Sequence, residues 1–368
     1  MRVTLGDVCE KGSSNLKQSD VINKTGAYPI YGAAGYLGNV DFYHQDKPYV
    51  AVVKDGAGIG RTTLHPAKSS IIGTMQYLLP KNNVLPEYLY YVVQYMHLEK
   101  YFTGATIPHI YFKDYKAEQF NLDAMERQKE IVASLQKVET LIKVRQQQLQ
   151  KLDELVKARF VELFGEPCKN SLGWNTSTVG ALISVCEAGW SGNGTQRKKE
   201  PGEIAVLKVS AVTKGYFIPA ECKVLDNQRN IKKYIFPHSG DLLFSRANTR
   251  EMVGATAVIT QDYPEHILPD KLWRIRFIDT ANVIYMKYVL SDESIRSIFS
   301  SVSTGTSGSM FNVSMDKFKS ITVPLPPLER QTRFAAFVEQ VNKSKVAVQK
   351  SLDEAQLLFD SLMQQYFE

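Results

Sequence analysis

The stretch of the sequence most similar to a catalytic motif is the glycine-rich run Asp55–Gly60, which follows the apolar segment Tyr49–Val53. A phosphate-binding G-x-G-x-x-G loop would end on a third glycine and open a helix whose N-terminus holds the anion. Here Arg61 stands where that glycine should be, and the residues after it favour β structure and end at Pro66. We therefore expect a glycine-rich β-turn that presents Lys54 and Arg61 rather than a cofactor site.

Other catalytic signatures are missing from the sequence. There is no GxxxxGK[ST] run, which excludes a P-loop motor, and no Asn-Pro-Pro-aromatic motif, so amino-methyl transfer by this chain is not expected. Glu221 and Lys223 have the spacing of a nuclease ExK pair, but the Pro-Asp pair at Pro269 follows them, which is the wrong order. The six histidines are scattered, and the four cysteines contain no CxxC pair. We therefore expect no metal, no cofactor and no reaction carried out by this chain.

The length and composition are those of an ordinary globular protein. At roughly 150 residues per domain, 368 residues predict two to three domains. Apolar residues make up 44% and charged residues 22%, which excludes wholesale disorder. Apolar runs are too short for a membrane-spanning helix, and the first residues contain no apolar signal core. The expected compartment is the cytoplasm.

Several short motifs occur twice along the chain in the same order, which indicates an internal repeat. The second copy of the Glu-Arg-Gln motif lies 203 residues after the first, and that of Leu-Asp-Glu lies 200 residues after. The matched pairs are Leu5-Gly6 with Val179-Gly180, Val8–Gly12 with Val185–Gly189, Thr103–Thr106 with Thr304–Ser307, Asn121–Gln128 with Pro324–Gln331, and Leu152–Glu154 with Leu352–Glu354. Each half therefore has a variable front part and a helical back part.

The two back parts carry apolar stripes at coiled-coil spacing over about five heptads. The first stripe runs from Ile131 to Leu163 and the second from Phe334 to Tyr366, about 35 residues or roughly 50 Å each. We expect the two helices to pack on each other, antiparallel if the halves are related by a two-fold rotation. Arg145 and Lys345 interrupt the stripes, and their charged ends either reach water or fix the register of the helices. Apolar residues off the stripes, covered by the front parts or left for a partner's helices, are Val132, Leu141, Val144, Leu155 and Leu357.

The front parts have the short strand-like runs and turn residues of mixed α/β domains. The predicted fold is α+β: two mixed α/β domains joined by two long antiparallel coiled-coil helices, with an internal pseudo-two-fold repeat. The predicted divisions are residues 1–125, 126–166, 167–328 and 329–368. Strands are expected at Tyr49–Val53, Met75–Leu79, Ile204–Val209, Asp241–Phe244 and Ala255–Ile259, and short helices at Glu87–Lys100 and Ile284–Phe299. The net charge is +6, and the 19 basic and 14 acidic residues of segment 167–328 supply +5 of it.

This order of variable domain, Glu-Arg-Gln motif and long helix, repeated once, resembles the DNA-specificity (S) subunits of type I restriction–modification enzymes. The strongest marks of the resemblance are Pro324–Gln331 and the helix after it, although Asn121-Leu122-Asp123 replaces the Pro-Leu-Pro form in the first half. Patterns similar to those of target-recognition domains also stand at Ser245–Arg250 with Val253-Gly254, at Asp270–Leu272, and at Tyr28–Gly32 with Gly35.

The resemblance implies a non-catalytic subunit in which each front domain binds one half of a split, asymmetric site in double-stranded DNA. The helices would set the distance between the domains and dock two methyltransferase (M) subunits, which carry S-adenosylmethionine and the chemistry, with or without motor-nuclease (R) subunits. The alternatives are a two-domain S-adenosylmethionine-dependent DNA methyltransferase that uses Asp55–Gly60, and a coiled-coil scaffold without a role on DNA.

The chemistry of DNA recognition selects the candidate contacts: Arg and Lys pair with guanine or phosphate, Asn and Gln with adenine, and Ser and Thr with either. In the first domain these are Lys11, Ser13, Asn15, Lys17, Lys54, Arg61 and Thr62. In the second they are Arg197, Lys198, Lys199, Ser245, Arg246, Asn248, Thr249, Arg250 and Lys271. Arg246 and Arg250, which flank Asn248-Thr249 directly after an apolar strand, are the strongest candidates for base reading.

Overall fold

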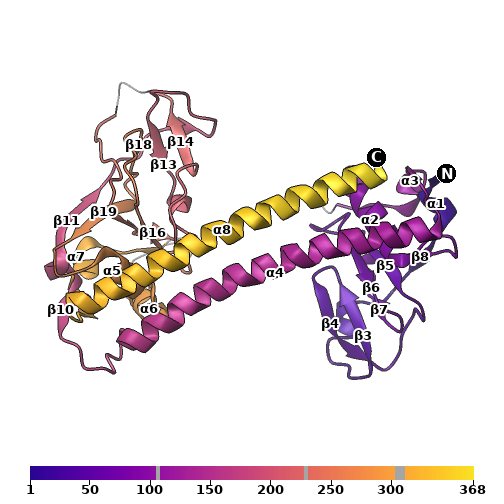
Figure 1. Ribbon diagram of the computed structural model, residues 1–368, viewed down its shortest axis with the longest axis horizontal. Coiled ribbons are helices and arrows are strands. Elements are labelled where there is room, and N and C mark those ends of the chain that lie inside the picture. Colours follow the sequence, from indigo (N-terminus) through magenta and orange to yellow (C-terminus); the bar gives the residue numbers. More distant parts are fainter. Residues whose placement is uncertain (105–107, 228–230, 303–310) are drawn as a thin grey trace. The chain divides into compact units, whose positions relative to one another are not determined.

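The computed structural model describes residues 1–104, 108–227, 231–302 and 311–368 (Figure 1). The chain divides into two compact units. The first unit is Met1–Gln148 together with Val348–Glu368, and the second unit is Leu149–Ala347. Each unit therefore contains one α/β part and a portion of both long helices. Of the predicted repeat motifs, Thr304–Ser307 and the end of Thr103–Thr106 lie outside the described residues.

Two helices of 40 residues each dominate the secondary structure: α4 (Met125–Phe164) and α8 (Leu328–Phe367). In the first unit, the α4 residues from Ile131 to Val138 share one core with the α8 residues Phe359, Met363 and Phe367. In the second unit, a core holds the later α4 residues Val156, Phe160 and Phe164 together with the early α8 residues Phe334, Val338 and Val341. Val156, Phe334, Val338, Val341, Phe359 and most of the early α4 residues belong to the two predicted apolar stripes. Phe160, Phe164, Met363 and Phe367 do not, and each follows a stripe position by one residue. Among the described residues, no helix is long and apolar enough to cross a membrane.

The α/β part of the first unit consists of short helices and sheets that are antiparallel except for the parallel pair of β3 and β7. Strand β1 (Arg2–Thr4) pairs with β9 (Gln119–Asn121), and a four-stranded sheet has the order β2-β8-β5-β6. A three-stranded sheet has the order β4-β3-β7. The remaining bounds are β2 Cys9–Ser13, β3 Tyr28–Gly32, β4 Gly35–Val40, β5 Tyr49–Val53, β6 Thr62–His65, β7 Ser70–Ile71, β8 Met75–Pro80, α1 Leu5–Val8, η1 Gln18–Asp20, α2 Pro86–Tyr95, η2 Leu98–Tyr101 and α3 Phe112–Tyr115.

The α/β part of the second unit repeats this plan. Strand β10 (Thr176–Thr178) pairs with β21 (Thr322–Pro324), and the four-stranded sheet has the order β11-β19-β15-β17. A second sheet has the order β12-β14-β13-β18, and β16 pairs with β20. The remaining bounds are β11 Ile183–Ala188, β12 Gly194–Thr195, β13 Ala205–Leu207, β14 Cys222–Leu225, β15 Leu242–Ser245, β16 Ala247–Asn248, β17 Thr256–Val258, β18 His266–Ile267, β19 Leu272–Phe277, β20 Phe311–Asn312, η3 Val179–Leu182, η4 Val209–Ala211, α5 Val283–Ser291, α6 Glu293–Val302 and α7 Met315–Ser320.

The glutamine of each Glu-Arg-Gln motif fastens a long helix to its α/β part. Gln128 is fully buried; its amide donates to Asn83 O and Asp123 O, and its Oε1 accepts from Leu85 N. Gln331 is also fully buried, and it makes the equivalent bonds to Thr280 O, Pro326 O and Asn282 N. The motif that marked the repeat in the sequence is therefore a repeated hydrogen-bonding device at the start of each long helix.

The alternation of side chains along the central strands explains why both faces of each sheet are covered. In β5, Val50 and Val52 face the core that contains α2, while Tyr49, Ala51 and Val53 belong to a cluster on the opposite face. Successive side chains of a strand point to opposite faces, so a strand covered on both sides is apolar throughout. The strand predicted at Tyr49–Val53 for this reason has the observed bounds.

The two short helices predicted from the sequence are each interrupted. The segment predicted as Glu87–Lys100 forms α2 to Tyr95 and then η2, because His97 has a left-handed backbone with φ of 50°. The segment predicted as Ile284–Phe299 forms α5 and α6, because Asp292 is extended and its carboxylate accepts a hydrogen bond from Ser294 N. Asp292 therefore ends one helix and caps the next.

The predicted α+β class and the two repeated regions agree with the structure. The antiparallel coiled coil, the pseudo-two-fold relation between the halves, and the division at residues 125, 166 and 328 stay predictions.

Candidate nucleic-acid interface

The sheets β2-β8-β5-β6 and β11-β19-β15-β17 each carry a loop of the same backbone design between their last two strands. In the first unit, Lys54 N donates to Thr74 O over 3.0 Å, and Gly60 N donates to Val53 O over 2.9 Å. In the second unit, the matching bonds are Arg246 N to Lys271 O at 3.1 Å and Gly254 N to Ser245 O at 2.9 Å. We call the segments 54–61 and 246–255 the first loop and the second loop.

The closing glycines explain the residue types at the end of each loop. Gly60 and Gly254 have φ of 80° and 82°, in the left-handed region that glycine adopts without strain. The first loop leads directly into strand β6, so it does not open the helix that a phosphate-binding loop requires. Its geometry is that of a turn that presents side chains, as the sequence predicted.

In the first unit, the structure gathers part of the predicted set near the first loop. Asn15 and Lys17 are exposed, and Gly73 N donates to Leu16 O between them, next to the Thr74 carbonyl that accepts from Lys54. Lys54 is half-buried. The remaining predicted residues are Lys11 and Ser13, exposed on β2, Arg61, exposed with its guanidinium donating to Ala33 O, and Thr62, whose hydroxyl donates to Gly60 O.

In the second unit, Arg246 is held in place by the segment before β19. Its Nε donates to Asp270 O over 2.9 Å, and its Nη2 lies 3.6 Å from the Asp270 carboxylate, which also accepts a hydrogen bond from the Ser191 hydroxyl. The half-buried Lys271 follows in the chain. Arg246, Asp270 and Lys271 are thus brought together, and the pairing of Arg246 with Asp270 was not predicted.

The remaining residues of the second loop differ in their exposure. Asn248 is half-buried on β16 with its Oδ1 accepting from Thr249 N, whereas Thr249 and Arg250 are exposed. Ser245 is completely buried at the end of β15, and its hydroxyl has no hydrogen-bond partner among the described residues. The prediction of Ser245 as a DNA contact is therefore corrected, because a base edge cannot reach a hydroxyl enclosed in the sheet.

The basic run at 197–199 is largely occupied by carboxylates. Arg197 makes two hydrogen bonds of 2.8 and 2.6 Å to Glu203, and this pairing holds the pKa of Glu203 at about 2. Lys199 is paired with Glu265, while Lys198 is exposed. Of the three, Lys198 has the placement best suited to a phosphate contact.

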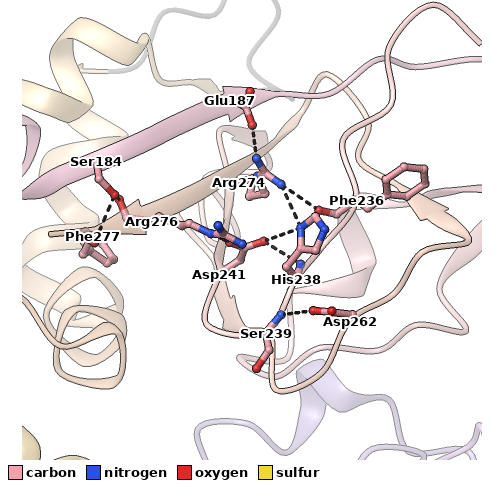
Figure 2. A network of polar contacts seen from close by, with 10 residues as sticks. All are labelled: Ser184, Glu187, Phe236, His238, Ser239, Asp241, Asp262, Arg274, Arg276 and Phe277. Atoms are coloured by element: carbon pink, nitrogen blue, oxygen red, sulfur yellow. Dashed lines mark hydrogen bonds and ion pairs between the residues drawn. The ribbon is translucent and has the colours of Figure 1, made fainter. Parts of the chain in front are cut away.

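Two arginines on β19 form a network that the sequence analysis missed (Figure 2). Arg276 donates to the fully buried carboxylate of Asp241 over 2.6 Å, and Arg274 is paired with Glu187 and with His238. The β-ladder registers place Arg274 and Asp241 where the first unit has the buried tyrosines Tyr77 and Tyr49. The charge of each arginine is therefore compensated by a carboxylate of the same sheet region.

A second pair that the sequence did not reveal lies beside the first loop. His109 Nδ1 and Asp55 Oδ1 are 2.6 Å apart, and each side chain is about one third exposed. The two residues are 54 positions apart in the chain, and no motif connects them. The matching place in the second unit is the contact between Ala247 and Asn312.

Comparisons with known proteins assign the family. The family described as "Type I restriction modification DNA specificity domain" matches residues 1–154 and 172–355, and the chain belongs to this family. Over 193 residues, the chain is 25% identical to the type I restriction enzyme EcoEI specificity subunit of Escherichia coli. That match covers 52% of this chain and 32% of the relative, so the chain spans about a third of the length of that protein.

Two solved structures have the same fold over the whole chain. One is a type I restriction–modification S subunit from M. genitalium, with a TM-score of 0.62, 13% identity, and coverage of 100% of this chain and 96% of that chain. The other comes from work on complex assembly and conformational transition of the type I R-M system, with a TM-score of 0.54, 16% identity, and coverage of 100% and 97%.

Proposed function

We propose that the chain is a non-catalytic, sequence-specific DNA-binding subunit of a type I restriction–modification complex. The observation that carries the proposal is the pair of equivalent glycine-closed loops, which share a backbone design and differ in their side chains. Two recognition loops with different side chains in one chain suit a split, asymmetric DNA site, because identical recognition loops related by symmetry would suit a palindrome. Membership of the specificity-domain family and similarity to the EcoEI specificity subunit support the same function. Such a subunit would act where the DNA is, in the cytoplasm.

Recognition in the second unit is assigned to the second loop. Asn248 has the donor and acceptor that match adenine, and Arg246 and Arg250 have the forked donors that match guanine or phosphate. Asp270 holds the Arg246 guanidinium in one orientation before DNA binds, which lowers the entropy lost on binding. Thr249 is exposed beside them.

Recognition in the first unit is assigned to the first loop and the segment next to it. Lys54, Arg61 and Thr62 would contact the other half of the site, and the exposed Asn15 and Lys17 would extend that surface. The exposed Lys11 and Ser13, together with Lys198 and Lys271 of the second unit, are assigned to phosphate contacts.

The long helices are proposed to form an antiparallel coiled coil that sets the distance between the two recognition loops. Two polar contacts, each within one unit, support the pairing: Arg145 Nε to Ser351 Oγ at 3.1 Å, and Lys345 Nζ to Asp153 Oδ1 at 2.6 Å. Apolar side chains that stay exposed on the helices are proposed to dock two methyltransferase subunits, with or without motor-nuclease subunits. These are Leu141, Val144, Leu357 and Leu358 in the first unit, and Leu155, Val161 and Val346 in the second unit.

Methylome sequencing of cells with and without the chain tests the proposed function. The expected result is a split, asymmetric methylated motif that disappears when the chain is deleted. A methylome that is unchanged by the deletion, in cells that produce the methyltransferase partner, would refute a role in specificity.

Loop variants then assign each half of the motif to one unit. Arg246→Ala and Asn248→Ala should each relax one half only, at about 1–3 kcal/mol per lost base contact. Lys198→Ala should weaken binding to all sequences and lower the salt slope by about one. Lys169→Ala is the matched control, because Lys169 is exposed and paired with Glu166. If the Arg246 and Asn248 variants altered opposite halves, the assignment of the second loop to one half would be wrong.

An insertion in α4 tests the proposed spacing role. Four residues inserted after Gln147 lengthen the helix by about 6 Å, at about 1.5 Å per residue, and nearly complete a helical turn. DNA advances about 3.4 Å per base pair, so the spacer should grow by about one or two base pairs while both half-sites are retained. Changed half-site bases with an unchanged spacer would show that the helices do not set the distance.

A further inference from the structure

A shallow cleft lies in the first unit between η2 and α3. Its lining contains two large rings that are unusually exposed, Phe102 at 59% and Tyr111 at 50%. The full lining is Lys100, Tyr101, Phe102, Thr103, Tyr111, Lys113 and Asp114. Exposed aromatic faces next to lysines are the combination with which proteins hold the sugars, bases and phosphates of nucleic acids.

The charged groups of the cleft lining are two lysines and one aspartate. The Lys113 ammonium lies 5.4 Å from the centroid of the Tyr111 ring and is half of a cation–π pair at the surface. Lys100 lies beside Tyr101, and its ammonium is paired with Glu118, whose carboxylate also accepts from the Tyr101 hydroxyl over 2.6 Å. Asp114 is the one carboxylate in the lining itself.

The cleft is continuous with the first loop. Gly56 N donates to Pro108 O over 3.0 Å, Ile110 N donates to Lys54 O over 3.0 Å, and His109 is bonded to Asp55. His109 also exchanges two backbone hydrogen bonds of 2.8 Å with Thr103. The His109 ring is stacked with the Tyr111 ring, with 6.4 Å between the ring centroids. A DNA backbone that left the first loop along the segment 108–110 would therefore reach Tyr111, Phe102 and Lys113.

We propose that this cleft binds the sugar–phosphate backbone of duplex DNA immediately outside the half-site that the first loop recognises. The proposal rests on the proposed function and adds a contact area to it. The rings of Phe102 and Tyr111 would pack against deoxyribose, and the Lys113 ammonium would pair with a phosphate. The contact carries no base sequence, so it adds affinity and orientation to the reading by the first loop.

Among the described residues of the second unit, the positions equivalent to Tyr111 and Lys113 carry other side chains. Ile110 N and Val313 N donate to the equivalent carbonyls of Lys54 and Arg246, which aligns Tyr111 with Ser314 and Lys113 with Asp316. Ser314 is the N-cap of α7, and Asp316 lies in its first turn. A serine and an aspartate would not hold a phosphate in this way, so the DNA contact should be longer at one half-site than at the other.

Duplexes of different length test the proposal with the full chain and its methyltransferase partner. One duplex ends at the outer edge of the half-site of the first unit, a second continues about ten base pairs further, and a third continues at the other end instead. Fluorescence anisotropy should give a Kd about tenfold tighter for the second duplex than for the first. Tyr111→Ala and Lys113→Ala should remove most of that gain and leave the Kd for the first duplex unchanged, and Lys113→Ala should lower the salt slope by about one.

The control variant is Tyr216→Ala, which removes a 57% exposed tyrosine of the second unit and should keep the full gain from the longer duplex. An unchanged Kd for the shortest duplex also shows that each variant is folded. The cleft proposal would be overturned if Tyr111→Ala and Lys113→Ala kept the full gain in affinity for the second duplex over the first. It would also be overturned if the third duplex showed the same gain in affinity and these variants removed it. A wild-type protein that bound none of the duplexes would instead overturn the proposed function.

Discussion

Replacing Gln331 by leucine should destabilise the second unit more than any surface change on α8. The buried amide makes three hydrogen bonds that join the start of α8 to Thr280, to Asn282 and to Pro326. Leucine keeps most of the volume but leaves two carbonyls and one N–H without their partner. At about 1 kcal/mol for each bond, and more where the group stays dry, the cost is about 3 kcal/mol. Gln331→Glu should cost at least as much, because a carboxylate cannot donate to the two carbonyls and would be buried.

Urea unfolding of the full chain measures this cost with a natural probe. The three tryptophans, Trp174, Trp190 and Trp273, all belong to the second unit, so their fluorescence reports on that unit. The matched control is Gln340→Leu, an exposed glutamine of α8 in the same unit, and it should change the stability by less than about 0.5 kcal/mol. A loss below about 1 kcal/mol for Gln331→Leu would refute the view that the repeated glutamine fastens the helix.

Three further changes have outcomes fixed by burial and charge. Burial lowers the pKa of His65 to about 4, so between about pH 6.5 and pH 4 the unfolded chain binds the proton more readily than the folded chain. The first unit of the wild type should therefore lose about 3 kcal/mol of stability as the pH falls through this range, measured by circular dichroism in urea. His65→Gln should remove this pH dependence. Burial, and then the charge of Lys345, lowers the pKa of Lys287 to about 8, so the wild type should gain stability as the pH rises above 8. Lys287→Met should therefore melt at a higher temperature than the wild type at pH 7, and this difference should be smaller at pH 9.5. Asp241→Asn removes the charge that faces Arg276 inside the sheet and should lower the stability seen by tryptophan fluorescence by about 2–4 kcal/mol, whereas a change within 0.5 kcal/mol would mean that the pair contributes nothing.

The sequence predicted those parts of the fold that depend on local periodicity. The helical stripe from Ile131 follows from a spacing of about 3.5 residues, and the strand Tyr49–Val53 follows from an unbroken apolar run. Neither pattern needs knowledge of the rest of the chain. The Glu-Arg-Gln repeat was visible too, but the role of its glutamine was not. The partners of Gln331 at Thr280 and Asn282 precede it by about 50 residues, and only the folded chain brings them together.

The candidate site was predicted less well, because exposure at the end of a strand depends on one residue of register. Ser245 and Arg246 are neighbours in the sequence, yet the first is enclosed in the sheet and the second reaches the loop surface. Periodicity does not fix a strand end to better than one or two residues. Partners such as Asp270 for Arg246, or His109 for Asp55, come from distant loops, and nothing in the local sequence could have identified them.

The short strand pairs at the edge of each α/β part have a consequence for how such chains change over evolution. Strand β1 pairs with β9, and β10 pairs with β21, so the point where the chain enters each part lies beside the point where it leaves. Leu325 N donates to Asn175 O over 2.7 Å, and Leu122 N donates to Met1 O over 2.8 Å. A part whose two ends touch can be exchanged for another of different length and sequence while the helices keep their register. Under the proposed function, recombination at these edges would supply a new DNA preference in one step, without intermediate forms that recognise nothing.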